Sequence, residues 1–519
     1  MLECMNERML SIFLSLVSGI VLGACATVQD EDDETQFHAA LEEAAGDIRE
    51  AVENEDSVPG ASLAIVDRKG ILHADGFGTL AADSNEPVST ETVFSIQSTS
   101  KTFTGVAVML AVQDGYLDLD APVSEYLPDF VVNSRFEDAP ERRMTLRHLL
   151  SHTAGFTHEA PVGNNIDARS PSFDAHVESI GETWLRAPVG ERYFYSNLGI
   201  DLAGYILQDA TGVPFETYVR ERILEPLGMD DSFVDTPDHH GGHCAACARG
   251  HDPGFVGLPD YIPLTASGGV RVSAEDGARF VRFMLKQGEL EGERLLEPEL
   301  MAEMVRPAAA RHKAFPGLDD AHYGLGVYSY PVSGTYAVNH DGGGFGFRAS
   351  MKWYPEYGVG YVLLINSAAG SANQVWNPVW NLLHELIEEG MIEPLQDDAI
   401  ASAEEQFSEA PGRQKPRRIE DLDPGKVKPV DDPDSYTGDY KARFGGGFEP
   451  NPEARVPAWD ISVSEEDGVL YLDSIDSEEA EPLVKHKPEL FFGALTGEAL
   501  DFRGDEVRWR NIPMEAAIE

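Results

Sequence analysis

The sequence predicts an α+β fold followed by a small all-β domain. Strand-like segments lie at both ends of the region 37–392, and helical segments lie between them. This order is typical of one sheet assembled from distant parts of the chain. Residues 393–432 are charged and contain several prolines, which is the composition of a linker. Short alternating apolar runs in residues 433–516 predict a barrel.

The composition limits the classes of protein and of partner. With 519 residues, the chain is long enough for two or more domains. Ninety acidic residues against 39 basic ones give a formal net charge of −51. Because such a field repels nucleic acid and anionic membrane surfaces, we expect neither as a direct partner.

The first 24 residues predict a signal peptide. The apolar stretch 9–24 is short for a bilayer span and runs into LGAC, residues 22–25. LGAC resembles the bacterial lipobox, in which cleavage leaves Cys25 to be acylated. An acidic tether, 25–36, follows. We expect a protein exported to the periplasm or cell envelope and held by a lipid at Cys25; an ordinary secretory signal is the alternative.

The elements expected in the larger region follow in chain order. They are a helix, a hairpin with an Arg-Lys-Gly turn, two amphipathic helices that end near glycines, and a second hairpin. Their residues are 40–53, 61–80, 202–212, 277–288 and 347–367.

A serine and a lysine stand at the start of an apolar helix. Residues 94–105 read FSIQSTSKTFTG, with Ser98 and Lys101 three residues apart. The hydroxyls of QSTS are expected to cap the helix, and its apolar sequence predicts burial. Burial and the helix dipole both lower the pKa of Lys101, and the spacing places its amine near the Ser98 hydroxyl. The spacing alone is expected about once by chance; its context indicates a nucleophile with its base.

Two further segments can complete a hydrolytic site. Tyr195 and Asn197 form the one Tyr-x-Asn of the chain, and a tyrosine beside a lysine can transfer protons. His340 precedes a glycine run, 342–344, whose N–H groups can bind an oxyanion. The run does not match the glycine motifs that bind phosphate.

Together these segments resemble the serine β-lactamase and penicillin-binding-protein-like superfamily, in the branch of class C β-lactamases, family VIII esterases and D-aminopeptidases. Ser98–Lys101 matches SxxK, Tyr195–Asn197 matches YxN, and His340–Gly342 stands where lactamases carry KTG. The resemblance covers about residues 45–385. It implies a β-lactamase-like fold, with an antiparallel sheet flanked by helices, an all-helical lobe, and the site between them.

The resemblance implies a role for each catalytic residue. Ser98 would be the acylated nucleophile and Lys101 its base. Tyr195 would pass a proton to the leaving group and help to activate the deacylating water. No cofactor and no metal are expected.

The resemblance also implies how substrate is held. Asn197 would position the lysine and the substrate, and His340 and Gly342 would line the pocket. The N–H groups of Ser98 and Gly343 would form the oxyanion hole. Because histidine supplies only a weak, pH-dependent charge where lactamases have a lysine, we expect weak β-lactamase activity. The C-terminal YTGDY, 436–440, looks like the lipocalin-like barrel of some family hydrolases.

Two other groups of residues could bear chemistry. Cys244 and Cys247 lie in the histidine-rich segment 239–251, where a disulfide, a metal site and free thiols all remain open. His148 and His152 are four residues apart but lack the glutamate of the HExxH zinc motif, so structural roles are expected.

The expected function is that of an exported serine hydrolase that forms an acyl-enzyme on Ser98. Its partner would be a small-molecule ester or amide. A carboxylesterase is the favoured hypothesis, and a D-aminopeptidase, a D-Ala-D-Ala-type peptidase or a weak β-lactamase is the alternative. From a different class, an idle binding or sensor protein would use the same pocket without turnover.

Overall fold

The computed structural model describes residues 31–169, 171–236, 244, 246–259, 261, 264–310, 321–397, 400–412, 418–423, 425–444, 447–451, 460–474, 480–504 and 506–516. The signal segment and Cys25 lie outside these residues, as do His239, His240 and His243. In this part of the chain, none of the helices has both the length and the apolar character needed to cross a membrane.

An eight-stranded antiparallel sheet forms the centre of the larger domain, in the order β2-β1-β14-β13-β12-β11-β10-β9. Its strands are β1 (Gly60–Asp67), β2 (Ile71–Gly78), β9 (Ala309–Ala310), β10 (His322–Tyr323), β11 (Tyr328–Val332), β12 (Thr335–Gly344), β13 (Phe347–Tyr354) and β14 (Val359–Ile365). The two predicted hairpins are therefore present, and β1 pairs with β14 to join the N-terminal strands to those near residue 360.

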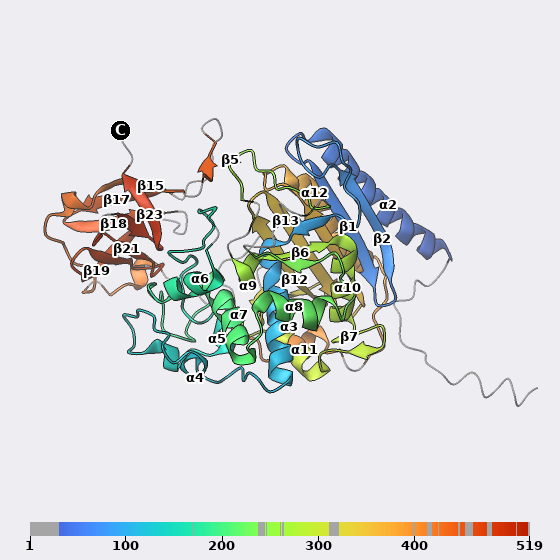
Figure 1. Cartoon of the computed structure of the whole chain (residues 1–519), viewed down its shortest axis with the longest axis horizontal. Helices are drawn as coiled ribbons and strands as arrows, with labels where there is room; N and C mark the ends of the chain where they lie inside the picture. The colour runs from blue at the N-terminus through green and yellow to red at the C-terminus, as the bar shows by residue number, and fades with distance from the viewer. Residues whose placement is uncertain are drawn as a thin grey trace, which may run out of the picture.

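Helices cover both faces of this sheet, so the central strands are buried on both sides (Figure 1). α2 (Glu31–Asn54), α12 (Ala372–Trp380) and α13 (Leu382–Glu388) share one apolar core with one face. α10 (Ala274–Leu285) packs on β1, β13 and β14 as part of a second core on the other face.

An all-helical lobe packs beside α10 (Figure 1). Its main helices are α3 (Ser100–Gln113), α4 (Val123–Tyr126), α5 (Leu146–Leu150), α6 (Phe173–Ile180), α7 (Asn197–Thr211), α8 (Phe215–Val219), α9 (Thr265–Gly268) and α11 (Pro298–Val305). The apolar segment predicted to be a buried helix is α3, and every residue from Ser100 to Ala111 is buried. The predicted β-lactamase-like α+β fold is confirmed.

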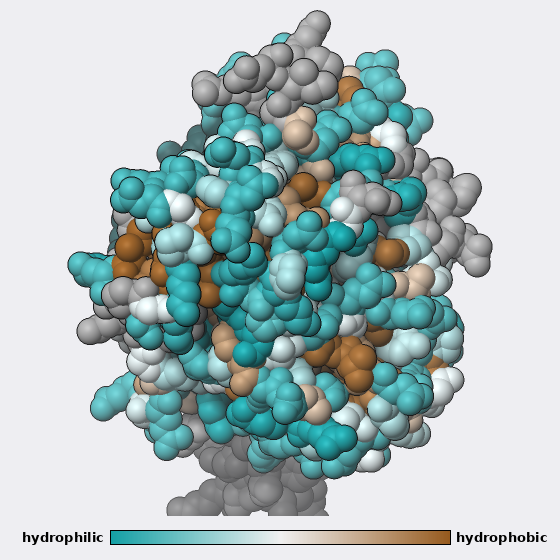
Figure 2. All heavy atoms as spheres, turned by 90° about the vertical axis from the view of Figure 1, so that its left-hand side faces the viewer, coloured by the Kyte–Doolittle hydropathy of each residue, from teal (hydrophilic) through white to brown (hydrophobic). Residues whose placement is uncertain are grey.

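The C-terminal region is a closed eight-stranded barrel, as predicted. Its strands are β15 (Gly438–Ala442), β17 (Ile461–Glu466), β18 (Val469–Asp473), β19 (Glu481–Lys487), β20 (Leu490–Gly493), β21 (Ala499–Asp501), β22 (Val507–Trp509) and β23 (Ile512–Ala516). The barrel lies next to α6, on the opposite side of the molecule from α2 (Figure 1). From the barrel side, the surface is mostly hydrophilic, with hydrophobic residues in separate patches (Figure 2).

The segment expected to be a linker contains a short helix, α14 (Ala403–Phe407). Ser402 and Glu405 form a capping box at its start, a Ser-x-x-Glu signature that the sequence reading did not use. Gln406 Nε2 donates to the Val305 carbonyl oxygen at 2.8 Å, so the helix docks on the larger domain. Further on, β16 (Glu449–Pro450) pairs with β5 (Phe255–Val256).

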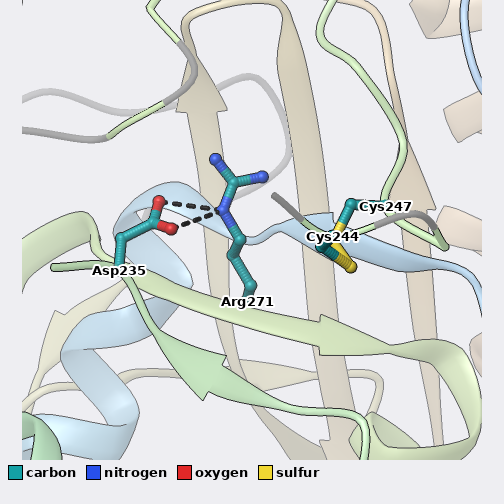
Figure 3. Close-up of a disulfide and its surroundings, with 4 residues drawn as sticks. All are labelled: Asp235, Cys244, Cys247 and Arg271. Atoms are coloured by element: carbon teal, nitrogen blue, oxygen red, sulfur yellow. Dashed lines mark hydrogen bonds and ion pairs between the residues drawn. A yellow bond between two sulfur atoms is a disulfide. The ribbon is translucent and has the colours of Figure 1, made fainter. Parts of the chain in front are cut away.

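A buried ion pair lies in the small sheet formed by β3 (Val93–Ser95), β4 (Phe233–Val234) and β6 (Val270–Ser273) (Figure 3). Arg271 Nε donates to both carboxylate oxygens of Asp235, at 2.9 and 2.8 Å, and the two side chains are 2% and 0% exposed. Cys244 and Cys247 form a disulfide near Arg271. Of the three states that the sequence left open, the structure contains the disulfide.

Removing Asp235 should destabilise the larger domain. An Asp235→Ala substitution leaves the Arg271 charge buried without its carboxylate, and we expect the free energy of unfolding to fall by about 3–5 kcal/mol. Equilibrium urea denaturation measures the change. As a control, Asp83→Ala removes an exposed pair with Arg249 and should change stability by less than about 1 kcal/mol. Equal effects of the two variants would contradict the prediction.

Candidate active site

Ser98 lies in a tight turn between β3 and α3. The turn is a 3-10 helix, η1 (Gln97–Thr99). Gln97, directly before Ser98, has a φ of +51°, in the left-handed region that L-residues rarely adopt. It is buried, and its Nε2 donates to Ser95 Oγ at 3.0 Å. Packing therefore holds a backbone conformation that costs of order 1–3 kcal/mol at the nucleophile.

The hydroxyls around Ser98 do not cap α3, so the expected capping role is wrong. At the cap residue Thr99, no side chain bonds to the free N–H groups of the helix. Thr99 Oγ1 instead donates to the His340 carbonyl oxygen at 3.2 Å, and Ser100 Oγ accepts from the Val270 N–H at 3.0 Å. Because this helix start is packed between β6 and β12, its hydroxyls bond to the backbone of those strands.

Lys101 is a fully buried amine in contact with Ser98. Its Nζ donates to Ser98 Oγ at 3.0 Å and to the Ser267 carbonyl oxygen at 2.9 Å. Burial lowers the pKa of Lys101 to about 7, against the opposing charges of Asp201 and Glu159. At neutral pH about half of a lysine with this pKa is the neutral amine, which can accept a proton from Ser98.

Asp201 fixes the carbonyl oxygen that Lys101 contacts. It lies on α7, is 0% exposed, and accepts from the N–H groups of Ala266 and Ser267 at 2.9 and 2.8 Å. Its second carboxylate oxygen accepts from Ser267 Oγ at 2.8 Å. Sequence reasoning missed this residue; its one signal was a lone acid within the otherwise apolar segment LGIDLAGYIL.

Tyr195 and Asn197 reach the site from the start of α7. The ring centre of Tyr195 lies 4.9 Å from Lys101 Nζ. Its ring packs against His152 at 4.5 Å and is stacked with His158 at 5.7 Å. Asn197 is buried, and its Oδ1 has no hydrogen-bond partner among the described residues.

His148 and His152, which are four residues apart in the sequence, have structural roles. His148 Nδ1 accepts from the Thr145 N–H at 3.2 Å in the capping box of α5. His152 Nδ1 accepts from the Ser196 N–H at 3.2 Å, which supports the loop next to Tyr195. Among the described residues, no cluster of three or more His, Cys, Asp or Glu side chains is arranged to hold a metal ion.

His340 faces the site from β12 without a fixed charge. Its Nδ1 lies 2.8 Å from the Asp341 carbonyl oxygen, and its Nε2 lies 2.9 Å from the Tyr323 hydroxyl. A carbonyl oxygen only accepts, so Nδ1 carries the proton. Nε2 can then accept from Tyr323, and the neutral ring satisfies both contacts.

Gly342 and Gly343 have different spatial roles. A Cβ at Gly342 would lie 2.0 Å from the Ile96 carbonyl oxygen, so only glycine lets β12 approach the Ser98 turn this closely. At Gly343 the nearest atom would be 4.0 Å away, and the residue is exposed. An approaching substrate therefore meets no side chain at Gly343.

The site opens into a cleft of about 650 Å³. Its lining includes Ser98, Tyr195, His340, Gly342 and Gly343. Arg348 of β13 and four residues of α12 also line it: Asn373, Trp376, Asn377 and Trp380. The structure thus brings predicted residues of three distant segments to one cavity. Lys101 is not part of the lining but contacts Ser98, which is. Asn197, Cys244 and Cys247 do not line the cavity.

Arg348 is the second residue that sequence reasoning missed. It lies opposite Gly343 in the β12–β13 pair, and its guanidinium donates to Asn373 Oδ1 at 2.5 Å. Burial lowers the pKa of Arg348, and none of the described carboxylates lies within 4.0 Å of it. Its position at the start of the strand that follows the glycine run was the sequence signal that could have identified it.

A serine bonded to a buried lysine, with a tyrosine beside both, defines a serine hydrolase that does not use a histidine base. Residues 39–384 match the Beta-lactamase family model, and the chain belongs to this family.

Similar proteins agree with this assignment. Penicillin-binding protein 4 of Amycolatopsis lactamdurans is 30% identical over 336 residues, which are 62% of this chain and 84% of that protein. The D-amino acid amidase of Ochrobactrum anthropi SV3 superimposes with a TM-score of 0.54 at 26% identity, covering 66% of this chain and 99% of the amidase. The hydrolase EstCE1 shares the fold, with a TM-score of 0.57, 19% identity, and coverage of 66% and 99%.

The pKa of Lys101 should control the pH dependence of acylation. Because the base is the neutral amine, we expect kcat/KM to fall as the pH decreases through about 7 and to level off above it. Glu159 raises this pKa, so Glu159→Gln should move the midpoint to lower pH. Steady-state kinetics between pH 5.5 and 9, about two pH units either side of neutrality, measure both curves. A flat profile across this range would contradict the assignment of Lys101, with its lowered pKa, as the base.

Proposed function

We propose that this serine hydrolase is a carboxylesterase that works through an acyl-enzyme on Ser98. The observation that carries the proposal is the 3.0 Å contact between Lys101 Nζ and Ser98 Oγ, made by a lysine whose pKa burial lowers to about 7. The intact set of Ser98, Lys101 and Tyr195 around one cleft argues against an idle binding or sensor protein.

Acylation begins when Lys101 takes the proton of Ser98 Oγ. The oxygen attacks the ester carbonyl carbon, and the N–H groups of Ser98 and Gly343 bind the developing oxyanion. As the C–O bond to the leaving alcohol breaks, Tyr195 donates its hydroxyl proton to that oxygen. The proton on Lys101 then restores Tyr195, and the active site is left as a neutral acyl-enzyme.

Deacylation repeats these steps with water. Lys101, through Tyr195, accepts a proton from the water that attacks the acyl carbon. The Ser98 oxygen leaves and recovers its proton, and the carboxylic acid is released. In each of the two half-reactions, Lys101 and Tyr195 each act once as an acid and once as a base.

The electrostatics on the β12 side of the cleft favour ester substrates over β-lactams. His340 is buried and bonded to the Asp341 carbonyl oxygen and the Tyr323 hydroxyl, so this position lacks the permanent cation that a lysine would offer to a β-lactam carboxylate. Esters have better leaving groups than amides and need less help from charged contacts. A neutral ester is therefore the proposed substrate class.

Arg348 favours a second candidate function, hydrolysis of amides whose leaving group carries a carboxylate. It lines the same cleft, and a guanidinium binds carboxylate with two parallel hydrogen bonds. The similarity to a D-amino acid amidase and to a penicillin-binding protein supports a peptidase or amidase of D-amino acids as this candidate.

Labelling and turnover test both candidates. Wild-type protein should react with a fluorophosphonate and hydrolyse p-nitrophenyl esters, and Ser98→Ala should lose both reactions by at least about a thousandfold. Assays with a D-amino-acid amide, an acyl-D-Ala-D-Ala peptide and a chromogenic cephalosporin rank the substrates. If Arg348→Met lowers kcat/KM only for carboxylate-bearing substrates, the second candidate is favoured. A wild type that neither labels nor turns over any substrate would refute the proposed enzyme activity.

We also propose export and lipid anchoring at Cys25. The support is the apolar stretch 9–24, the LGAC sequence that follows, and the acidic tether behind it. In bacterial cells fed labelled palmitate, wild-type protein should incorporate label and sediment with membranes. Cys25→Ala should do neither; incorporation equal to wild type would contradict the proposal.

A further inference from the structure

A continuous series of hydrogen bonds links the segment around Tyr195 to the C-terminal barrel. Ser196, between Tyr195 and Asn197, donates from Oγ to the Thr157 carbonyl oxygen at 2.6 Å. Thr157 Oγ1 in turn donates to Glu498 Oε2 at 2.7 Å. Glu498 belongs to the connection between β20 and β21, so two hydrogen bonds separate the barrel from the residue next to Tyr195.

Glu498 is a buried carboxylate that is held by cations from both domains. It is 1% exposed. Its Oε1 pairs with Arg186 Nη1 of the larger domain at 3.0 Å and with Arg510 Nε of the barrel at 3.3 Å. Arg186 Nε also donates to the Thr496 carbonyl oxygen at 3.0 Å. This carboxylate therefore organises the contact between the two domains.

The loop that begins at Thr157 is anchored in the barrel a second time. Ile166 is 1% exposed and belongs to the apolar core of the barrel, with Trp509, Phe491 and other inward-facing residues. Asn511 Nδ2, at the β22–β23 turn, donates to the Glu159 carbonyl oxygen at 3.0 Å. The loop 157–166 is thus bound to the barrel at both of its ends.

The same loop presents two side chains to the catalytic residues. The His158 ring is stacked on the Tyr195 ring. Glu159 is 0% exposed, is held by Asn165 Nδ2 at 2.7 Å, and acts electrostatically on Lys101. Any displacement of the loop therefore changes the packing of Tyr195 and the electrostatic environment of Lys101.

We propose that the barrel is a positioning element of the active site, acting through Glu498 and Ile166 on the loop 157–166 and through that loop on Tyr195. The barrel contributes no catalytic group in this account. It fixes the side chains that surround the proton-transfer residue, and Glu498 and Thr157 are positioning residues. The inference rests on acyl-enzyme chemistry at Ser98 and holds whether the substrate is an ester or an amide.

The Thr157–Glu498 hydrogen bond gives a nearly isosteric test in the full-length protein. Thr157→Val removes the hydroxyl and keeps the carbonyl oxygen that Ser196 contacts, whereas Thr157→Ser retains the bond. We expect Thr157→Val and Glu498→Gln to lower kcat by about 10- to 100-fold with KM within about twofold, because small misplacements of catalytic groups cost this much. Thr157→Ser should keep kcat within about threefold of wild type.

Tyr440 supplies a control within the barrel. This buried barrel residue donates from its hydroxyl to the Tyr436 carbonyl oxygen at 2.9 Å. Tyr440→Phe should lower the thermal midpoint of the protein but keep kcat at temperatures well below that midpoint. The midpoint of the pH profile separates the variants further, since only displacement of Glu159 should move it to lower pH.

Two results would overturn the inference. One is a wild-type kcat and pH midpoint in Thr157→Val. The other is a loss of kcat in Tyr440→Phe as large as in Glu498→Gln, which would show that barrel stability alone matters. Failure of the wild type to label or turn over substrate is a different result, because it refutes the proposed function itself.

Discussion

The burial of the Lys101 amine determines how the elements around the active site are packed. Lys101 can be a neutral base only if water is kept from it, and that requires α3 to be covered on every side by the sheet, α7, α9 and α11. The Asp201 carboxylate then holds the Ser267 carbonyl against the amine, so that a fully buried nitrogen still has hydrogen-bond partners. The lowered pKa of Lys101 and its ability to activate Ser98 both result from this burial.

Sequence could predict those features that depend on nearby residues. The Ser98–Lys101 contact follows from helical spacing, and the hairpins follow from apolar alternation around short turns. The roles of Asp201 and of the Thr157–Glu498 contact could not be predicted, because their partners lie far away along the chain. Arg348 lies shortly after the glycine run in the sequence, and this signal was missed. The expected hydroxyl cap is wrong because the hydroxyls of Thr99 and Ser100 bond instead to the backbone of strands from distant segments.

For binding in the cleft, the positions of the charged groups matter more than the net charge of the chain. In a chain with ninety acids, the cleft contains a guanidinium with no carboxylate within 4.0 Å among the described residues, while the Arg271 and Arg186 guanidinium groups are buried with acidic partners. Arg348 donates to Asn373 and to the Ala368 carbonyl oxygen, and with no carboxylate bonded to it in the described part of the chain it offers a favourable position for an anion in the cleft.

Two contacts join segments that are synthesised far apart in time. One is the pairing of β1 with β14, and the other is the insertion of Ile166 into the barrel. Ala61 pairs with Ile365, and Ile166 packs against residues as late as Met514. Such non-local contacts form slowly, because loop closure must precede them. During synthesis, the nucleophile helix emerges long before the strands that cover it, and the loop beside Tyr195 has its final support only when β23 has closed the barrel. Assembly of the active site is therefore one of the last events in the maturation of this protein.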